Sequence, residues 1–538
     1  MIGYLPIVMM NIQNIRTAFQ TFLQPSEKTA RTVENAALAL WVFAVVASTL
    51  THELWRDETR EYLMAIGTDS FADYFNLAKY DGHPLLWRTI LMAMHVLIPH
   101  PVVLQTASLV IGFCTVYLIV KHSPFPLIIK TLFIFGIIPF SVNTVDARDY
   151  GISMLLFFAI AISYSKTERH PLVIGILLFL EANTNQYGMY LSCLFLAGWI
   201  VDSGFHVLKD KRYLIAAAIA IAGVLISYLS TQVADSVFIG PEHYARIKWG
   251  AVLLKSLCHP GEYIYYILNI KPVYRDIFVT GLIVALFAVR PYLGITLFLA
   301  VFFFNLVGGA FIYPNTRHQG VLIGFIIMLY WIALHGLQRR EYPGLFKHSR
   351  IIFYTVLFAF LIPFLIEQIR INIIIVREEA RVEKSTAQAV GKYLTTNAQL
   401  EKAIIIGYPE YAIEPIAFYA KNQIYLTQEH TLRNFVKFSK EFQENTSLMD
   451  TLGSAVELNV QYKVPIIIVL GYFGVKEGKV FGAIYRGNFK FNHINEFKEK
   501  TIKLAEFNRS LGDENFQVFL YLPPDELRKY REKYMELR

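Results

Sequence analysis

The sequence predicts an α-helical polytopic membrane protein that carries a C-terminal α/β domain. Three observations support this fold class. The chain of 538 residues is 55% hydrophobic and only 17% charged, whereas an average soluble domain carries about 25% charged residues. Residues 36–373 consist mostly of apolar runs separated by short polar loops. The segment that follows Arg377 holds roughly half of all charged residues, which is typical of a soluble domain.

Apolar segments of nearly helix-spanning length recur along the first 373 residues. A helix of about 20 residues crosses the hydrocarbon core of a bilayer. The candidate segments are 34–52, 84–98, 101–121, 125–142, 149–164, 171–183, 187–203, 213–231, 274–289, 292–312, 318–337 and 350–369.

The basic loops decide how these segments cross, because loops rich in lysine and arginine stay on the cytoplasmic side. Such loops lie near residues 28–31, 121–122, 166–170, 209–212, 290 and 339–350. Placing all of them on one side requires an odd number of crossings. We therefore expect about eleven crossings, with segment 84–98 as an interfacial helix. That segment is short and carries Arg88 and His95.

This topology divides the chain into three parts. Residues 1–33 form a cytoplasmic N-terminal segment, 34–373 the transmembrane domain, and 374–538 a soluble exoplasmic α/β domain. The loops between the crossings are short and basic on one side. On the other side they are longer and contain the acidic, histidine and arginine residues that could act on a substrate. We therefore expect the working face and the C-terminus on the exoplasmic side, which is the periplasm or cell surface in a bacterium and the lumen in a eukaryote. Of these, our expectation is a bacterial inner membrane with the periplasmic or extracellular side as the working side.

The C-terminal segment alternates short apolar runs with helix-like patterns, which predicts a small α/β domain. The expected strands cover residues 403–407, 423–426, 464–470 and 516–522. The expected helices cover residues 410–420, 432–444, 448–458, 494–509 and 525–537.

Composition and motifs argue against several other classes of protein. The net charge of +8 is explained by basic cytoplasmic loops, so we expect no nucleic-acid partner. Cys114, Cys193 and Cys258 lack the paired spacing of a zinc site or a disulfide framework. The sequence also contains no glycine-rich nucleotide motif and no HExxH zinc-protease motif.

Candidate catalytic residues occur directly after the first apolar segment, where five of the seven residues 55–61 are ionisable. Charge at a membrane boundary is costly unless it is solvated, paired or used. Asp57 and Glu61 would share one face of a helix. Two such nearby carboxylates can hold one raised pKa, which suits a general base, or they can supply oxygen ligands for a divalent cation. The alternative is a solvated loop in which the acids pair with Arg56 and Arg60.

Three further outer turns carry groups suited to a phosphate or a sugar. His83 stands at a predicted helix start, where anions are favoured. Arg148 can bind phosphate through two parallel hydrogen bonds, although a salt bridge to Asp146 or Asp149 is the structural alternative. Arg317 and His318 add positive charge from the far end of the domain. We expect these turns to converge with Asp57 at the outer edge of the membrane.

The long outer loop between residues 231 and 275 mixes cations with aromatic residues. His243, Arg246 and Lys248 would suit an anionic headgroup or a sugar ring of an acceptor. Aromatic and basic residues also anchor ordinary loops at the membrane interface, and this second interpretation remains open.

In their order and spacing, these motifs resemble those of the GT-C class of integral-membrane glycosyltransferases. The resemblance is to the protein-O-mannosyltransferase-like and aminoarabinose-transferase-like group, which is glycosyltransferase family 39-like, and it covers roughly residues 30–373. The matching motifs are Asp57-Glu58, Gly82-His83-Pro84-Leu85, Ala147-Arg148-Asp149-Tyr150 and Thr316-Arg317-His318-Gln319. Leu85 departs from the His-Pro-Pro pattern of the group, and the fourth motif matches loosely.

The resemblance implies a GT-C fold and a lipid-linked donor, which is a polyprenyl- or dolichyl-phosphate sugar. The acceptor would be a hydroxyl of a glycan, a lipid or a protein. Asp57 would be the general base, while Glu58 and His83 orient the donor or acceptor. The donor phosphate and sugar would bind at Arg148, Asp149, Arg317 and His318.

Members of the class usually invert the anomeric centre, so no covalent intermediate is expected. No cofactor is expected, and no metal site is assigned, although a divalent cation stays open. Two other functions also stay open. One is a polytopic transporter or lipid flippase, and the other is a polysaccharide ligase that uses a diphosphate-linked donor.

Overall fold

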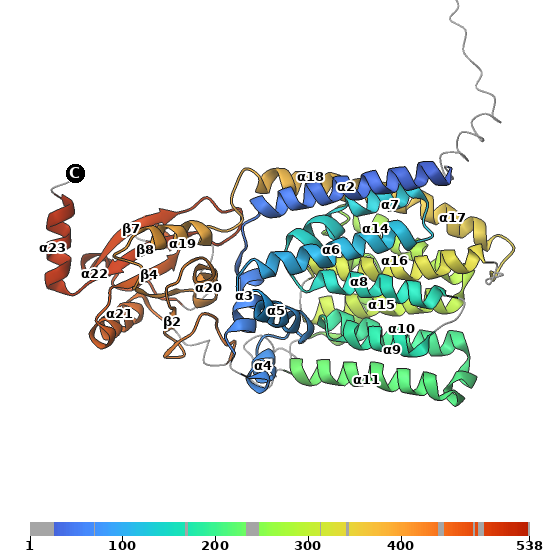
Figure 1. Cartoon of the computed structure of the whole chain (residues 1–538), viewed down its shortest axis with the longest axis horizontal. Helices are drawn as coiled ribbons and strands as arrows, with labels where there is room; N and C mark the ends of the chain where they lie inside the picture. Colours follow the sequence, from blue (N-terminus) through green and yellow to red (C-terminus); the bar gives the residue numbers. More distant parts are fainter. Residues whose placement is uncertain are drawn as a thin grey trace, which may run out of the picture.

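The computed structural model describes residues 26–68, 70–166, 170–232, 247–311, 314–339, 344–439, 446–476, 479–481 and 489–535. Most helices lie together in one elongated body, and a sheet with its own helices forms a domain at one end of that body (Figure 1). Among the described residues, eight helices are long and apolar enough to cross a membrane. This is the architecture of a polytopic membrane protein.

In its described residues the body is built from α-helices, one π-helical segment (Ile138–Val145) and two short 3-10 helices (Phe205–Lys209 and Glu262–Ile264). The α-helices are α2 (Glu27–Thr51), α3 (Arg56–Ile66), α4 (Phe71–Ala78), α5 (Leu86–Leu97), α6 (Val103–His122), α7 (Leu127–Ile134), α8 (Tyr150–Ser165), α9 (Pro171–Ala182), α10 (Gln186–Ser203), α11 (Lys211–Thr231), α13 (Trp249–Cys258), α14 (Pro272–Val289), α15 (Pro291–Ala310), α16 (Thr316–Gln338), α17 (Ser349–Ala359) and α18 (Leu361–Glu379).

Each of the apolar segments predicted from the sequence contains a helix. The eight candidate spans are α2, α6, α7 with the π-helical segment, α11, α14, α15, α16, and α17 with α18. The other three predicted crossings correspond to α8, α9 and α10. Helices α5 and α9 have 12 residues each, which is about 18 Å against a hydrocarbon core of about 30 Å. The count of eleven crossings therefore stays a prediction.

Helix α16 forms the centre of the body and is buried along nearly its whole length. It packs against α8, α14, α15 and the π-helical segment. A helix that is apolar on all sides is stable only where other helices surround it. This packing fixes the first turn of α16 at the end of the body that faces the C-terminal domain (Figure 1).

The π-helical segment precedes the turn that contains Arg148. The backbone N–H of Asp146 donates to the carbonyl of Ser141 over 2.8 Å, five residues back. Such wide turns are uncommon, and they occur frequently at functional sites. Here the wide turn ends a buried helical segment, and residues 146–149 then run toward the C-terminal domain.

The C-terminal domain has a mixed sheet between two layers of helices. The strand order is β1-β4-β8-β7, with β1 and β4 parallel and the other neighbours antiparallel. Alternate strand residues enter two cores: Ile405 and Ile467 pack with α19 and α20, whereas Ile404 and Ile466 pack with α21 and α22. This follows from the two-residue period of a strand. The elements are α19 (Ala387–Thr396), β1 (Ile404–Tyr408), α20 (Glu410–Tyr419), β2 (Tyr425–Leu426), β3 (Thr431–Leu432), α21 (Leu448–Tyr462), β4 (Ile466–Gly471), β5 (Gly474–Lys476), β6 (Lys479–Phe481), α22 (Ile494–Lys500), β7 (Thr501–Phe507), β8 (Phe516–Tyr521) and α23 (Pro524–Met535).

Two predicted helices of this domain were wrong. The described part of 432–444 contains no helix, since the N–H of Val436 bonds to Glu414 and that of Lys437 to Glu429. These side-chain acceptors hold the segment in an irregular conformation. In 494–509, α22 ends at Lys500 and β7 follows, because this stretch pairs with β8 and completes the sheet. Pairing with a neighbouring strand decides between strand and helix here, and a local pattern does not show it.

The ends of the helical body differ slightly from the predicted boundaries. Helix α2 begins at Glu27, after Ser26 caps it, so the helix starts before residue 34. Helix α18 continues to Glu379, beyond residue 373. The C-terminal domain is thus connected to the body by the short stretch between α18 and α19.

Candidate functional site

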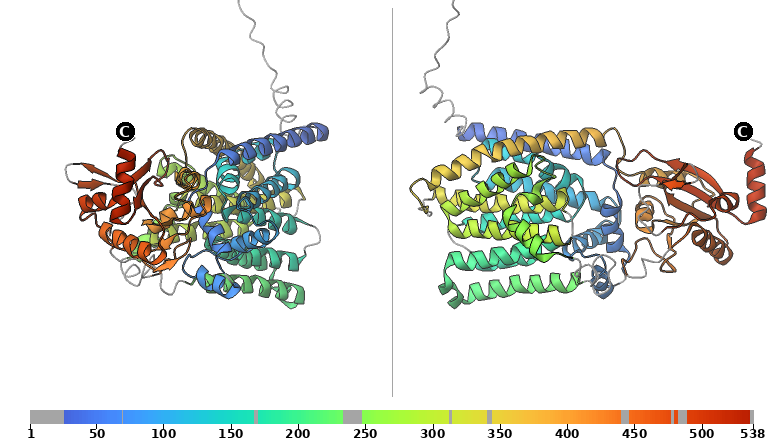
Figure 2. Two further views of the ribbon diagram at one scale, coloured as in Figure 1. Left: turned by 60° about the vertical axis from the view of Figure 1, so that its left-hand side comes forward. Right: turned by 180° about the vertical axis from the view of Figure 1, so that it is seen from behind.

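Most of the predicted catalytic and donor-binding residues come together at the end of the body that faces the C-terminal domain. They lie at the start of α3, in the turn before α5, between the π-helical segment and α8, and at the start of α16. Helix α3 lies between the body and the C-terminal domain (Figure 1), and the view from behind shows the same arrangement (Figure 2, right). Segments far apart in the sequence therefore share one small volume.

Asp57 is at the centre of this group. Its Oδ2 accepts a hydrogen bond from Arg317 Nη1 over 2.7 Å and lies 3.4 Å from Arg148 Nη1. Arg148 Nη1 also donates to the backbone carbonyl of Asp57 over 2.5 Å. Burial favours the neutral acid, but the two guanidinium groups outweigh it and hold the pKa of Asp57 well below its usual range. The carboxylate is therefore ionised and is held between two cations.

His83 and Asp149 complete the group around Arg148. The His83 ring faces Asp81 through Nδ1 at 3.1 Å and lies with Nε2 3.4 Å from Arg148 Nη2. Asp149 is buried, and Arg148 Nε lies 3.7 Å from its Oδ1. Neither carboxylate oxygen of Asp149 has a hydrogen-bond partner among the described residues. Both oxygens are therefore open to a hydroxyl group of a ligand, and burial raises the pKa of the Asp149 carboxyl.

His318 lies beside Arg317 in the first turn of α16. Its Nε2 is 3.1 Å from the hydroxyl of Tyr150, and its Nδ1 accepts from the backbone N–H of Asn315 over 3.4 Å. The ring also packs on Tyr187, with centroids 5.1 Å apart. These contacts fix the turn that presents Arg317 to Asp57.

Glu58 points away from Asp57 and is fully buried. Its carboxylate lies 3.0 Å from His52 Nε2 and accepts from the N–H of Ala147 over 2.7 Å. Burial opposes both charges, but each ion stabilises the other: the pKa of Glu58 is lowered and that of His52 is raised to about 10. Glu58 therefore holds α3 against the segment before Arg148, and it does not join the Asp57 cluster.

Glu61 lies one turn after Asp57 on the same face of α3, as predicted. Arg88 Nε donates to Glu61 Oε2 over 2.6 Å, and Arg88 also contacts Asp81. Burial disfavours the ion, but Arg88 and His83 lower the pKa of Glu61 to about 2. A second ionised pair therefore lies directly beside the Asp57 cluster.

Sequence reasoning did not assign His52, Asp81 or Lys384 to this region. Lys384 Nζ contacts Asp146 Oδ1 over 2.5 Å and Glu379 Oε1 over 3.4 Å. Asp81 lies in the same outer loop as His83, and its acidic side chain next to that motif could have identified it as a site residue. Lys384 follows the last crossing at a distance from every motif, so its sequence position carried no signal.

The predicted acceptor loop is only partly described. His243 and Arg246 lie outside the described residues. Lys248 is exposed immediately before α13. None of the contacts in the described part of the chain joins Lys248 to the Asp57 cluster.

A cavity of about 410 Å³ lies between the body and the C-terminal domain, next to the Asp57 cluster. Trp55 and Thr316 line it on the side of the cluster, and Ile137, Val142 and Ile375 form an apolar part. The polar lining is Asp146, Glu378, Glu379, Lys384, Asp513 and Glu514. The cavity combines an aromatic ring and apolar surface with several hydrogen-bonding groups, as ligand pockets do.

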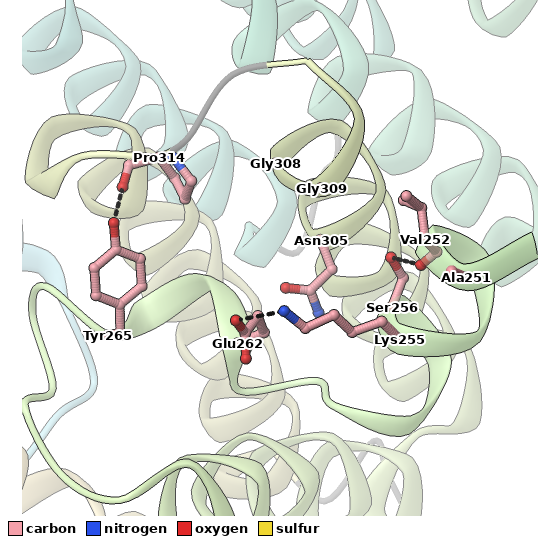
Figure 3. A pocket seen from close by; sticks show the side chains of 10 residues that line it. All are labelled: Ala251, Val252, Lys255, Ser256, Glu262, Tyr265, Asn305, Gly308, Gly309 and Pro314. Atoms are coloured by element: carbon pink, nitrogen blue, oxygen red, sulfur yellow. Dashed lines mark hydrogen bonds and ion pairs between the residues drawn. The ribbon is translucent and has the colours of Figure 1, made fainter. Parts of the chain in front are cut away.

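A second cavity of about 280 Å³ lies between α13 and α15 (Figure 3). Lys255 and Glu262 form an ion pair over 2.9 Å at this cavity, and the hydroxyl of Tyr265 donates to the carbonyl of Pro314 over 3.1 Å. Gly308 and Gly309 leave space that larger residues would fill. Pro314 stands shortly before Arg317, so this cavity borders the same end of α16.

Two groups of side chains among the described residues could hold a cation. They are His52, Glu58 and Asp146 in one group, and Glu61, Asp81 and His83 in the other, with ligand atoms within 4.8 Å of one another. Lys384 contacts the first group and Arg88 the second. A metal ion would have to displace these cations, so neither group is assigned as a metal centre.

Glu514 makes the stability of the protein depend on pH. Although Arg56 lies nearby, burial raises the pKa of this carboxyl from 4.5 to about 7. The folded state binds the proton more tightly, so the stabilising contribution is complete below pH 4.5 and is lost as the pH rises through about 7. The shift corresponds to roughly 3 kcal/mol. We expect the thermal midpoint in detergent to fall between about pH 5 and pH 8, and to fall less in Glu514→Gln. Equal falls in both proteins would contradict this assignment.

No protein-family model matches this sequence, and no curated protein matches it.

Proposed function

We propose that the chain is a membrane glycosyltransferase of the GT-C type. It moves a sugar from a polyprenyl-phosphate donor to an acceptor hydroxyl at the exoplasmic face. One observation carries the proposal: the Asp57 carboxylate contacts Arg317 over 2.7 Å and lies 3.4 Å from Arg148 at one end of an apolar helical body. A general base and two phosphate-binding cations in direct contact are what this reaction requires.

The donor phosphate binds Arg148 and Arg317 in this mechanism. Guanidinium groups form parallel charge-assisted hydrogen bonds to phosphate oxygens. The phosphate competes with Asp57 for both cations, so the pKa of Asp57 rises when the donor arrives. Asp57 thus becomes a better base only when the donor is present.

Asp57 then takes the proton of the acceptor hydroxyl. The acceptor oxygen forms a bond to the anomeric carbon while the bond from that carbon to the phosphate oxygen breaks. The electron pair leaves with the lipid phosphate, whose new charge is stabilised by Arg148 and Arg317. His83 and Asp149 hold hydroxyl groups of the sugar. The configuration at the anomeric carbon inverts, because a single displacement occurs.

The acceptor approaches through the cavity between the body and the C-terminal domain. It is a glycan, a lipid or a protein hydroxyl, and its sugar-like or apolar portion contacts Trp55. In this proposal the body crosses a bacterial plasma membrane eleven times, with α5 at the outer interface. The active site and the C-terminal domain both lie on the periplasmic or extracellular side.

Arg317→Ala tests donor binding. Loss of a charge-assisted hydrogen bond costs about 1.5–3 kcal/mol, which corresponds to roughly a 10- to 150-fold rise in donor KM. The assay follows labelled sugar from polyprenyl-phosphate donors to membrane acceptors. Arg317→Lys should lose less, because it keeps the charge. An unchanged donor KM in Arg317→Ala would remove this residue from the donor site.

A transporter or lipid flippase is the second candidate, and buried Glu181 in α9 favours it. Intramembrane carboxyl groups mark substrate or proton pathways in transporters. Mass spectrometry of cells that lack the chain separates the two functions. A missing transferase leaves the sugar-carrying lipid donor unused in the membrane and removes a surface sugar. A missing flippase leaves the lipid-linked substrate in the cytoplasmic leaflet.

A further inference from the structure

Helix α3 presents two pairs of charged residues to two different parts of the molecule. Asp57 and Glu61 face the cations of the body. Arg56 and Arg60, each one residue earlier, contact the C-terminal domain, and Arg60 also binds Asp81 in the loop before α5. Residues four apart share a helix face, whereas adjacent residues do not. The same short helix is therefore held from both sides.

Arg60 has the most buried of these contacts. Its Nη1 donates to Glu414 Oε1 over 2.6 Å, and its Nη2 donates to the carbonyl of Val436 over 2.8 Å. The guanidinium group also lies over the ring of Phe438, 4.3 Å from the centroid. The same Glu414 oxygen accepts from the N–H of Val436 over 2.6 Å. Arg60 is thus bound to a preassembled acceptor on the C-terminal domain.

Further contacts hold the start of α3. Arg56 Nη1 donates to Asp513 Oδ1 over 2.6 Å, and the Arg56 backbone N–H donates to Glu514 Oε1 over 3.0 Å. The hydroxyl of Tyr419 donates to the carbonyl of Leu54 over 3.0 Å. These groups come from the C-terminal domain and surround the turn that carries Asp57.

We propose that the C-terminal domain contributes to the membrane active site. Its Glu414 forms an ion pair with Arg60 and thereby sets the position of Asp57. Arg60 and Glu414 are positioning residues in this view, and the inference rests on the proposed function. An isolated helix of 11 residues is marginal in water, so contacts from outside must hold α3. A helix moves as a rod, and a shift on the Arg60 face therefore displaces the Asp57 carboxylate. A displacement of about 1 Å costs roughly 100-fold in rate.

Glu410 supplies a matched control. It is buried one turn before Glu414 on α20, and its carboxylate accepts from Thr427 and Gln428 within the C-terminal domain. Glu410→Ala and Glu414→Ala therefore remove the same kind of buried group from the same helix. Only the second removes a contact with α3.

The experiment compares full-length variants in nanodiscs at equal amounts of folded protein. We expect Glu414→Ala to lower the turnover of sugar transfer roughly 10- to 100-fold, with donor KM within about threefold of the wild type. Donor KM is retained because Arg148 and Arg317 belong to the body. Glu410→Ala should keep turnover near the wild type. Glu414→Gln should keep most of it, since its amide oxygen still accepts from Arg60 and Val436.

Hydrogen exchange gives a second measurement that does not need activity. The backbone amides of residues 56–66 should exchange faster in Glu414→Ala than in Glu410→Ala. Equal exchange in the two variants, or equal losses of turnover, would overturn the proposal. A third outcome is that the wild type transfers no sugar while the amides of α3 exchange faster only in Glu414→Ala. In that case the proposed function is wrong, but the C-terminal domain still holds α3 in position.

Discussion

Asp57→Asn is expected to lower the rate of sugar transfer by about 10²- to 10⁴-fold, which is the usual contribution of a general base. Asparagine keeps the size of the side chain, and its Oδ1 still accepts the hydrogen bond from Arg317. It has no carboxylate to take the proton of the acceptor. The affinity for polyprenyl phosphate should survive, because the two arginines no longer share their charge with an anion at this position.

The measurement uses membranes with equal amounts of each variant and one labelled donor at saturation. Asp210→Asn is the control, since Asp210 pairs with Arg212 in an exposed turn and should transfer sugar at the wild-type rate. Asp57→Glu should recover part of the activity, because it restores a base at an altered distance. Near-normal transfer by Asp57→Asn would exclude Asp57 from the chemical step.

Arg88→Ala is expected to destabilise the folded protein by about 3–5 kcal/mol, which is typical of removing one partner from a buried ion pair. Arg88 is fully buried and contacts both Glu61 and Asp81. Asp81 keeps Arg60 as a partner over 2.8 Å, but Glu61 loses the side chain that stabilises its charge. The loss should appear as a lower thermal midpoint and a lower yield of detergent-soluble protein.

Two comparisons make the Arg88 prediction specific. Arg88→Lys keeps the charge but loses the paired geometry, so its midpoint should lie between those of the wild type and the alanine variant. Arg212→Ala removes an exposed pair and should change stability by less than about 1 kcal/mol. A midpoint of Arg88→Ala equal to that of Arg212→Ala would show that the buried pair contributes little.

Helix positions in the body could be predicted from the sequence because long apolar runs have few alternatives in a membrane protein. Every apolar segment from 34 to 369 contains a helix. The errors fell in the C-terminal domain, at 432–444 and 501–509. There, Glu414 and β8 supply partners from distant parts of the chain. A local pattern does not contain such partners, so it could not distinguish a helix from a loop or a strand.

The candidate site shows the same division. Local charge and turn signals identified Asp57, His83, Arg148 and Arg317, and the structure brings them together. The spacing of residues in the sequence could not show which cation each carboxylate pairs with. The carboxylate of Glu58, which is next to Asp57 in the sequence, pairs with His52 instead. The choice depends on the direction of each side chain around α3, which only the packed structure fixes.

The grip on α3 has a consequence for how a newly made chain reaches activity. Arg56 and its partner Asp513 are separated by 457 positions, which a ribosome covers in roughly 20–90 s. During that interval Asp57 has been made, but the partners that we propose position α3 from the C-terminal domain have not. If the proposed function holds, we expect a polypeptide released before residue 414 to transfer sugar more slowly than the 538-residue chain.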